Sequence, residues 1–459
     1  MAITSPTYDP ISTASALAEK YVSGQQQILS SRTSKATATE KALGDLGTAL
    51  SSFQASLTTL TSSSKTLFAQ SAVFSDTSIG TASATAAAAP GTYSLFVERL
   101  ATAAQVSYSG LTEDSGVKGM LKLKVGTTVI EVDLAAANSD GAATKLTPRE
   151  IAAAINAHKD NASLVTASVI ATGVNEKGLA TYELVLTAKN TGVGSTLSID
   201  ADSVSASSLS GKSANVLVEP QDALIKIGSA SGTPITQSTN TFNNIDGVTM
   251  TFTKASTTPI TLTVAADTGK TAANVQGFVD AYNKLKTVLD ALVSPGDPSK
   301  GKAGGTFAGD SGVTALRDRL VSLLRQSGST SLAAYGITAN RQGTLTLDST
   351  RLNKALAQDP NGLDALIGTV SGTTPTGIAG KLDAYIKGWT SATNGQIKVR
   401  REAVSKLQIE LTSRQDLLDK QYDTAYNRYL MQFTQLQTVQ SLMTNNSSMF
   451  DALFSSDKD

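Results

Sequence analysis

Long stretches near both ends of the chain carry apolar residues at the spacing of an amphipathic helix, and this pattern limits the possible folds more than any other feature. Between Leu29 and Leu67 the spacing is a heptad repeat. One seam holds Leu29, Ala36, Leu43, Leu50 and Leu57, and the other holds Leu46, Phe53, Leu60 and Leu67. Arg32 and Thr39 occupy the second seam in its first half. Because most other residues here are Ser, Thr, Ala and Gln, a helix in this segment needs a partner to be stable.

The segment from Ile397 to Met443 supplies a candidate partner, because it has a long helical pattern without proline. Its apolar stripe consists of Val404, Leu407, Leu411, Leu418, Tyr422, Ala425, Tyr429, Phe433, Leu436 and Met443, and Arg414 and Gln440 interrupt it. If the two terminal helices pack together, the chain must leave the helix pair and return to it. We therefore expect a helical stalk with the middle of the chain beyond it.

A third helix is predicted from Val275 to Leu292, ending at Pro295 and Gly296, and shorter helices are predicted at 310–324 and 349–356. The middle of the chain instead alternates apolar and polar residues, which is typical of strands. These runs include 93–97, 121–125, 130–134, 165–169, 182–186, 197–199, 248–252 and 260–264. One helix interrupts them, because Thr147, Pro148 and Glu150 form a capping-box pattern.

The predicted fold is therefore an α+β multidomain chain, with a coiled-coil-like helical stalk from its terminal segments and a β-rich head of two subdomains from its middle. The boundaries we expect are a flexible assembly segment at 1–42, a stalk at 43–80 plus 270–443, a head subdomain at 81–108 plus 219–269, an inserted outer subdomain at 109–218 and a flexible assembly segment at 444–459. The candidate seam and self-assembly residues are Leu43, Leu46, Leu50, Phe53, Leu57, Leu60, Leu418, Tyr422, Tyr429, Phe433 and Leu436.

Composition excludes several classes of function. Among 459 residues, Lys plus Arg and Asp plus Glu both number 38, so no net field favours nucleic acid or an anionic membrane. The absence of Cys removes disulfides, thiolate metal sites and Cys nucleophiles. The first residues lack a basic start and an apolar core, so we expect no cleaved signal peptide, and the segment 81–89 is too short to span a bilayer.

Four features could indicate chemistry, but each has a simpler interpretation. His158 is the only histidine and lies at the predicted end of the capped helix, where a polar residue is ordinary. The P-loop-like run 296–302 has Ala303 where a hydroxyl must bind magnesium. Asp200 and Asp202 give too few ligands for calcium, and the basic run 398–401 is typical of a solvated helix face. We therefore expect no enzyme activity, no cofactor and no metal.

Several longer motifs resemble those of the flagellar cap family, called FliD. FNNIDGVTMTFTK at 242–254 and VQGFVDAYNKLKTVL at 275–289 resemble its C-terminal region, with FVDAYN the most specific part. SLFVERLATAAQVSYSG at 94–110 resembles the end of its N-terminal region, and IAAAIN at 151–156 is similar to the flagellin and hook IN motif. The tail 427–454 is also similar to the family pattern. The start departs from the family, since Tyr8, Asp9, Pro10 and Ile11 replace a Ser-Gly-Leu-Asp-like segment.

The resemblance implies a ring-like homo-oligomer at the distal, extracellular tip of a bacterial flagellar filament, where it retains flagellin and promotes its folding and insertion. It also implies export through the flagellar type III machinery with an export chaperone, and contact with hook-associated junction proteins before the filament grows. The residues before about Leu43 and after about Met443 are expected to be mobile in an isolated subunit. The alternatives are a surface adhesin, whose head would bind a host ligand, and another axial flagellar protein of the hook junction or filament.

Overall fold

The computed structural model describes residues 9–62, 66–113, 119–137, 146–200, 209, 214–325, 331–371 and 374–455. The chain divides into two compact units, each described by itself below. The helical unit combines Met1–Leu67 with Ala272–Asp459, and the β-rich unit is Phe68–Thr271. This confirms the predicted fold class, in which helices from both ends of the chain flank a strand-rich middle.

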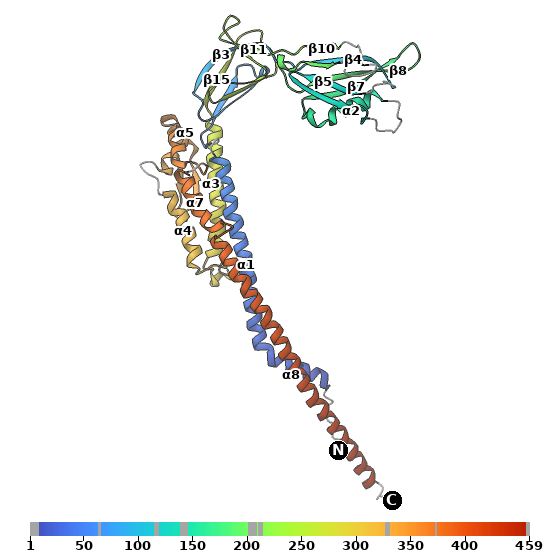
Figure 1. Cartoon of the computed structure of the whole chain (residues 1–459). Helices are drawn as coiled ribbons and strands as arrows, with labels where there is room; N and C mark the ends of the chain where they lie inside the picture. The colour runs from blue at the N-terminus through green and yellow to red at the C-terminus, as the bar shows by residue number, and fades with distance from the viewer. Residues whose placement is uncertain are drawn as a thin grey trace. The chain divides into compact units, whose positions relative to one another are not determined.

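The helical unit contains long and short helices and one hairpin (Figure 1). Its helices are α1 (Pro10–Leu60), α3 (Thr268–Val293, whose first turn belongs to the β-rich unit), α4 (Ser311–Arg325), α5 (Ser349–Gln358), α6 (Gly362–Ile367), α7 (Gly377–Thr390) and α8 (Gln396–Ser455). The hairpin pairs β16 (Ile337–Ala339) with β17 (Leu345–Leu347). Short 3-10 turns lie at Pro298–Lys300 and Leu332–Tyr335 in this unit, and another lies at Lys159–Asn161 in the β-rich unit.

Helix α1 begins where the sequence departs from the family pattern. The Asp9 carboxylate accepts hydrogen bonds from the backbone N–H groups of Ile11 and Ser12, at 3.2 and 3.1 Å, and Pro10 takes the first helical position. These hydrogen bonds hold the pKa of Asp9 below its ordinary value. The departure therefore encodes a helix cap.

The second half of α1 packs inside the helical unit. Its seam residues Leu43, Leu46, Leu50, Phe53 and Leu57 are all buried. The Phe53 ring meets the Tyr282 ring of α3 edge-on, with centroids 6.3 Å apart. Gln54 joins α7 to α1 by donating to Asp383 and accepting from Thr390, both at 2.9 Å. This half of α1 is thus fixed by packing on two sides.

The β-rich unit contains two separate hydrophobic cores. The first lies between a five-stranded sheet, in the order β1-β15-β3-β11-β12, and a three-stranded sheet, in the order β13-β14-β2. The strands are β1 (Gln70–Phe74), β2 (Gly80–Ala84), β3 (Gly91–Arg99), β11 (Ala223–Ile227), β12 (Thr233–Gln237), β13 (Thr241–Ile245), β14 (Val248–Phe252) and β15 (Ile260–Ala266). All pairs in both sheets are antiparallel.

The second core lies among a four-stranded sheet, in the order β10-β4-β8-β7, a three-stranded sheet, in the order β6-β5-β9, and helix α2 (Pro148–Ala157). The strands are β4 (Gln105–Thr112), β5 (Met120–Val125), β6 (Thr128–Asp133), β7 (Val165–Val174), β8 (Ala180–Ala188), β9 (Leu197–Asp200) and β10 (Asn215–Val218). A 3-10 turn at Val193–Ser195 precedes β9. The two cores confirm a head of two subdomains.

Helix α2 follows its sequence signals closely. Its capping box is complete: the Glu150 N–H donates to the Thr147 hydroxyl at 3.2 Å, and the Thr147 N–H donates to the Glu150 carboxylate at 2.9 Å. The last residue of the IAAAIN motif, Asn156, fixes the helix to β7, since its amide donates to the Ala167 carbonyl at 2.7 Å and accepts from the Ala167 N–H at 2.8 Å. The motif thus joins a helix to a strand.

The predicted boundaries differ from the structure at two places. Residues 68–80, assigned to the stalk, form β1 and the start of β2, because β1 pairs with β15 of the β-rich unit. The cut at 108 divides β4, whose residues Val106 and Tyr108 belong to the second core. Helix α7 was not predicted, although Ile378, Leu382 and Ile386 recur every four residues and are buried.

The packing of Phe53 gives a stability test. We expect Phe53→Ala to lower the free energy of unfolding of the helical unit by about 3–5 kcal/mol, because it removes a buried ring beside Tyr282. Urea unfolding followed by circular dichroism measures the change. The control is Ser51→Ala, an exposed position two residues away, which should change it by less than about 0.5 kcal/mol. Equal effects of the two substitutions would show that α1 is not packed in this way.

Candidate assembly interface

Helices α1 and α8 pack side by side in opposite directions. Their polar contacts show the register: Glu40 pairs with Arg401 at 2.6 Å, and Ser15 lies 3.1 Å from the Tyr422 hydroxyl. Between them the Gln26 and Gln415 side-chain amides each donate to the other at 3.0 Å. The two helices are thus antiparallel.

The apolar seam between these two helices is thin. Its hydrophobic cluster consists of Val22, Leu29 and Ala36 on α1 and of Leu411 and Leu418 on α8, with Val404 and Tyr422 half-buried beside them. Ala14, Ala18 and Ala425 are also buried, and all three are small. Leu407, which the sequence pattern placed in the stripe, is 42% exposed. Because most of these buried residues are alanine or valine, the seam buries little apolar surface and stabilises the pair weakly.

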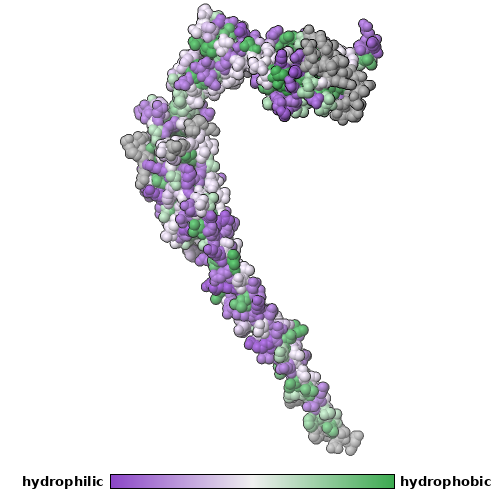
Figure 2. Space-filling view, in the orientation of Figure 1, coloured by the Kyte–Doolittle hydropathy of each residue, from purple (hydrophilic) through white to green (hydrophobic). Residues whose placement is uncertain are grey.

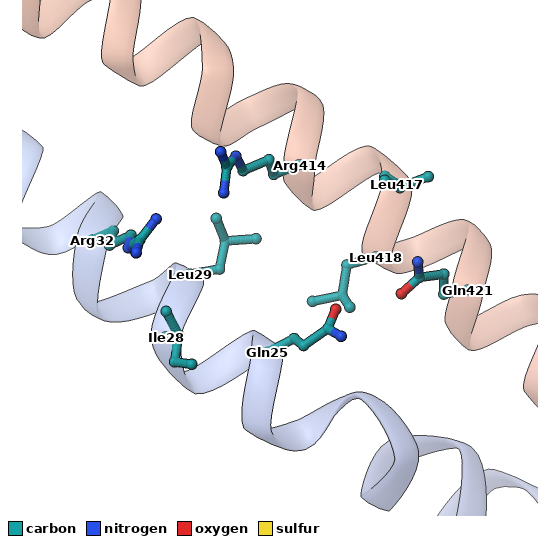
Figure 3. Close-up of a pocket in the computed structure, with 8 residues that line it drawn as sticks. All are labelled: Gln25, Ile28, Leu29, Arg32, Arg414, Leu417, Leu418 and Gln421. Atoms are coloured by element: carbon teal, nitrogen blue, oxygen red, sulfur yellow. The ribbon is translucent and has the colours of Figure 1, made fainter.

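The two charged interruptions of the sequence stripes meet across this seam. Arg32 of α1 and Arg414 of α8 turn toward the same gap above Leu29 (Figure 3). The gap is a cavity of about 410 Å³, lined by Gln25, Ile28, Leu29, Arg32, Arg414, Leu417, Leu418 and Gln421. We call it the arginine notch. The sequence pattern showed each arginine only as an interruption of its own apolar stripe. It could not show that the two side chains lie close together, because their proximity depends on the register of the two helices.

The predicted seam residues fall into two groups. Leu43, Leu46, Leu50, Phe53 and Leu57 are in the interior of the subunit, with Leu60 half-buried at the end of α1. On α8, Leu418 is buried, Tyr422, Tyr429 and Phe433 are half-buried, and Leu436 is 45% exposed. The α1 group therefore holds the subunit together, and only the later α8 residues are available to another chain.

The last part of α8 runs past the first turn of α1 (Figure 1). The Arg428 guanidinium lies over the Tyr21 ring, 6.0 Å from its centroid, and over the Tyr429 ring at 4.8 Å. Beyond this contact α8 exposes many large apolar side chains, and apolar surface is visible there in Figure 2. They are Met431, Leu436, Val439, Leu442, Met443, Met449, Phe450 and Leu453.

This surface is a candidate binding interface. Val439, Leu442, Met449 and Leu453 share one side of the helix, and Leu436, Met443 and Phe450 recur every seven residues beside them. A contiguous apolar face on an exposed helix marks a protein contact site. Sequence analysis ended the stripe at Met443 and missed its continuation to Leu453, although the Met and Phe spacing was available.

The chain matches two models of one family: the N-terminal model of flagellar hook-associated protein 2 over residues 7–104, and the C-terminal model over 220–445. The chain belongs to the flagellar hook-associated protein 2 family, FliD. It is 32% identical over 384 residues to the lateral flagellar hook-associated protein 2 of Vibrio parahaemolyticus, covering 81% of this chain and 83% of that one. It is 30% identical over 457 residues to the A-type protein of Pseudomonas aeruginosa, covering 92% and 90%.

A solved structure agrees with this family assignment. The D1-D2-D3 domains of the flagellar cap protein FliD from Escherichia coli match with a TM-score of 0.62 and 27% identity, over 79% of this chain and 99% of that one. FliD is a family of flagellar structural proteins, not a known enzyme family.

The features that could have indicated chemistry have structural roles in this FliD chain. His158 Nδ1 accepts from the Asp160 N–H at 3.3 Å, capping a 3-10 turn. The P-loop-like run forms a loop in which Asp297 caps the turn Pro298–Lys300. Asp202 lies outside the described residues. Among the described residues, no group of three His, Cys, Asp or Glu side chains is placed to hold a metal, and no helix is long and apolar enough to cross a membrane.

The basic run at the start of α8 also has a structural role. Arg400 binds the Asp310 carboxylate through both terminal nitrogens, at 2.6 and 3.1 Å, and its guanidinium lies over the Trp389 ring, 5.5 Å from the centroid. The hydrogen bond from Arg400 holds the pKa of Asp310 below its ordinary value of 3.8. This pair fixes the start of α8 to the loop before α4.

The Asp310–Arg400 pair predicts a pH-dependent stability. The pKa of Asp310 is lower in the folded protein than in the unfolded chain. The ionised carboxylate therefore adds to the free energy of unfolding above the unfolded pKa of 3.8, and this contribution is lost as pH falls through the folded pKa. We expect Asp310→Asn to lower the free energy of unfolding by about 1–2 kcal/mol at pH 7. The difference from the unsubstituted protein should shrink as pH falls below 3.8. Urea unfolding at pH 7 and at a pH below 3.8 measures this difference in the free energy of unfolding. The control is Asp318→Asn on α4. A difference that is the same at the two pH values would refute the ion-pair explanation.

Proposed function

We propose that this FliD-family chain caps a bacterial flagellar filament. Several copies assemble as a ring at the extracellular distal tip, retain exported flagellin and promote its folding and insertion as the filament elongates. Export occurs through the flagellar type III machinery with an export chaperone, and hook-associated junction proteins are the partners before filament growth. The family assignment and the similarity to the flagellar cap protein FliD of Escherichia coli support this proposal.

The observation that carries the proposal is the apolar face at the end of α8. Its side chains Leu436, Val439, Leu442 and Met443 are 45–67% exposed in the subunit. A soluble subunit gains no stability from such a face, whereas an assembly that covers it gains about 25 cal/mol for each Å² removed from water. A contact limited to one face of one helix can also be released and remade as each flagellin enters.

Substitution of this face tests the function. We expect Leu436→Asp with Met443→Asp to leave the subunit folded but to abolish filament growth and motility and to release flagellin into the medium, because two charges prevent burial of the face. The matched control is Thr434→Asp with Ser441→Asp, which has the same spacing on the polar side of α8. Swimming assays and immunoblots of the medium in complemented deletion cells measure the outcome. Normal filaments in the first variant would contradict the proposal.

The thin seam of the helix pair leads to a second test. We expect amide hydrogens of residues 10–42 and of those after Met443 to exchange rapidly in a dilute monomer, because a seam built largely of alanine and valine opens readily. In an assembled sample the same amides should be protected. Hydrogen–deuterium exchange with mass spectrometry compares the two, with the buried segment 43–57 as an internal control. Full protection of both segments in the monomer is the contrary result.

Adhesion through the head is an additional proposal, based on the hairpin of β7 and β8. Its tip exposes Val174 at 71% and Leu179 at 53%, and Ile170 on β7 is 52% exposed. Deletion of the whole protein separates the functions: a cap is required for filaments, whereas a protein that is only an adhesin leaves motility unchanged.

A further inference from the structure

The arginine notch lies on one face of α8. Arg414, Leu417 and Gln421 follow one another at three- and four-residue intervals, so they share a face, and Arg428 continues it two turns later. Ile28 of α1 and Leu417 form an apolar rim, at 58% and 57% exposed. The notch is therefore an open site in which charge and apolar surface occur together.

The charge in the notch is poorly neutralised. Arg414 pairs with Glu410 one turn before it, but both side chains are more than half exposed, so this pair contributes little. Arg32 makes no hydrogen bond or ion pair with the described part of the chain. Two guanidinium groups directed at one gap repel each other, and a carboxylate between them would accept charge-assisted hydrogen bonds from both (Figure 3).

A matching acidic face lies on the same length of α8. Asp416, Asp419 and Asp423 have the same three- and four-residue intervals as the notch residues, shifted by two positions. A shift of two residues is about 200° around a helix, so the acidic face points away from the notch. All three carboxylates belong to exposed residues, and the face stays net negative even with Lys420 on its edge.

We propose that the arginine notch of one copy receives the Asp416, Asp419 and Asp423 face of the next copy. This inference rests on the self-assembly in the proposed function and names the contact. Because the two faces differ, the contact is heterologous, which is the type that closes a ring. The arginine notch and the acidic face occupy the same length of α8, so copies related by rotation about a common axis bring the two faces together without a shift along the helix. Ile28 and Leu417 are removed from water as the carboxylates enter the notch.

Cross-linking tests the contact, because the chain has no cysteine of its own. Ile28→Cys places a thiol on the rim of the notch, and Thr412→Cys places one on the acidic side of α8, four residues before Asp416, without removing a carboxylate. In one subunit these positions lie on opposite sides of the helix pair. We expect oxidation of the assembled double variant to give a ladder of covalent oligomers, and either single variant to give none.

Charge reversal supplies the second part of the test. In the two-cysteine background, Arg32→Glu with Arg414→Glu should lower the yield of cross-linked oligomer at least tenfold. Adding Asp416→Lys, Asp419→Lys and Asp423→Lys should restore it, since the complementary charges are then exchanged. The matched control, Lys41→Glu with Lys300→Glu, reverses two side chains that are 80% exposed and should keep the ladder. Circular dichroism checks that each variant is folded.

The outcomes separate this inference from the proposed function. Oligomers seen by mass photometry without a ladder, or a covalent dimer from Ile28→Cys alone, overturn the contact and leave the cap proposal standing. A reversed pair that keeps the full ladder also overturns it. A protein that remains monomeric at every concentration overturns the cap proposal and the contact together.

Discussion

The weak pairing of α1 with α8 is the interaction on which the rest of the structure depends. It brings together segments separated by almost the whole chain, as the reciprocal amide bonds of Gln26 and Gln415 show. Its apolar content is small, because most of its buried residues are alanine or valine. The pair is strong at the other end, where α1 enters a core with α3 and α7, and Arg400 binds Asp310. Stability therefore decreases along α1 toward Pro10.

This gradient is suited to a subunit that completes its structure on assembly. A firm core in the second half of α1 keeps the subunit folded. The part of the helix pair with the thin seam carries the arginine notch and the acidic face, and the exposed apolar end of α8 follows it. Contacts between copies bury apolar area and neutralise charge in the part of the isolated subunit that buries the least apolar area and leaves the most charge without a counterion. The two β-rich cores fold without contributing to this gradient, since each closes its own hydrophobic residues.

Sequence predicted those parts of the fold that local patterns determine. The heptad of α1, the stripe of α8, the end of α3 and the Thr147 capping box were all readable, because helix spacing and caps depend on near neighbours. Helix α3 begins at Thr268, seven residues before the predicted Val275. The boundary at 80 was too late, because the place of β1 depends on its pairing with β15 almost 200 residues away. Helix α7 was missed, although its apolar residues have a helical spacing.

In the candidate interface, too, local spacing predicted some features, whereas others depend on contacts between distant segments. Leu418, Tyr422 and Phe433 could be chosen from their spacing, but which residues are interior and which are exposed depends on where α1 begins beside α8. The notch could not be predicted at all, since Arg32 and Arg414 are 382 positions apart (414 − 32) and meet only in the observed register.

Electron cryomicroscopy of the assembled full-length protein, at a resolution that shows side chains, tests the central claim most directly. The account predicts α1 and α8 antiparallel with Gln26 beside Gln415, and the α8 face from Leu436 to Leu453 covered by another polypeptide. Helices packed in a different register, or an apolar face left in solvent within a complete assembly, would contradict it.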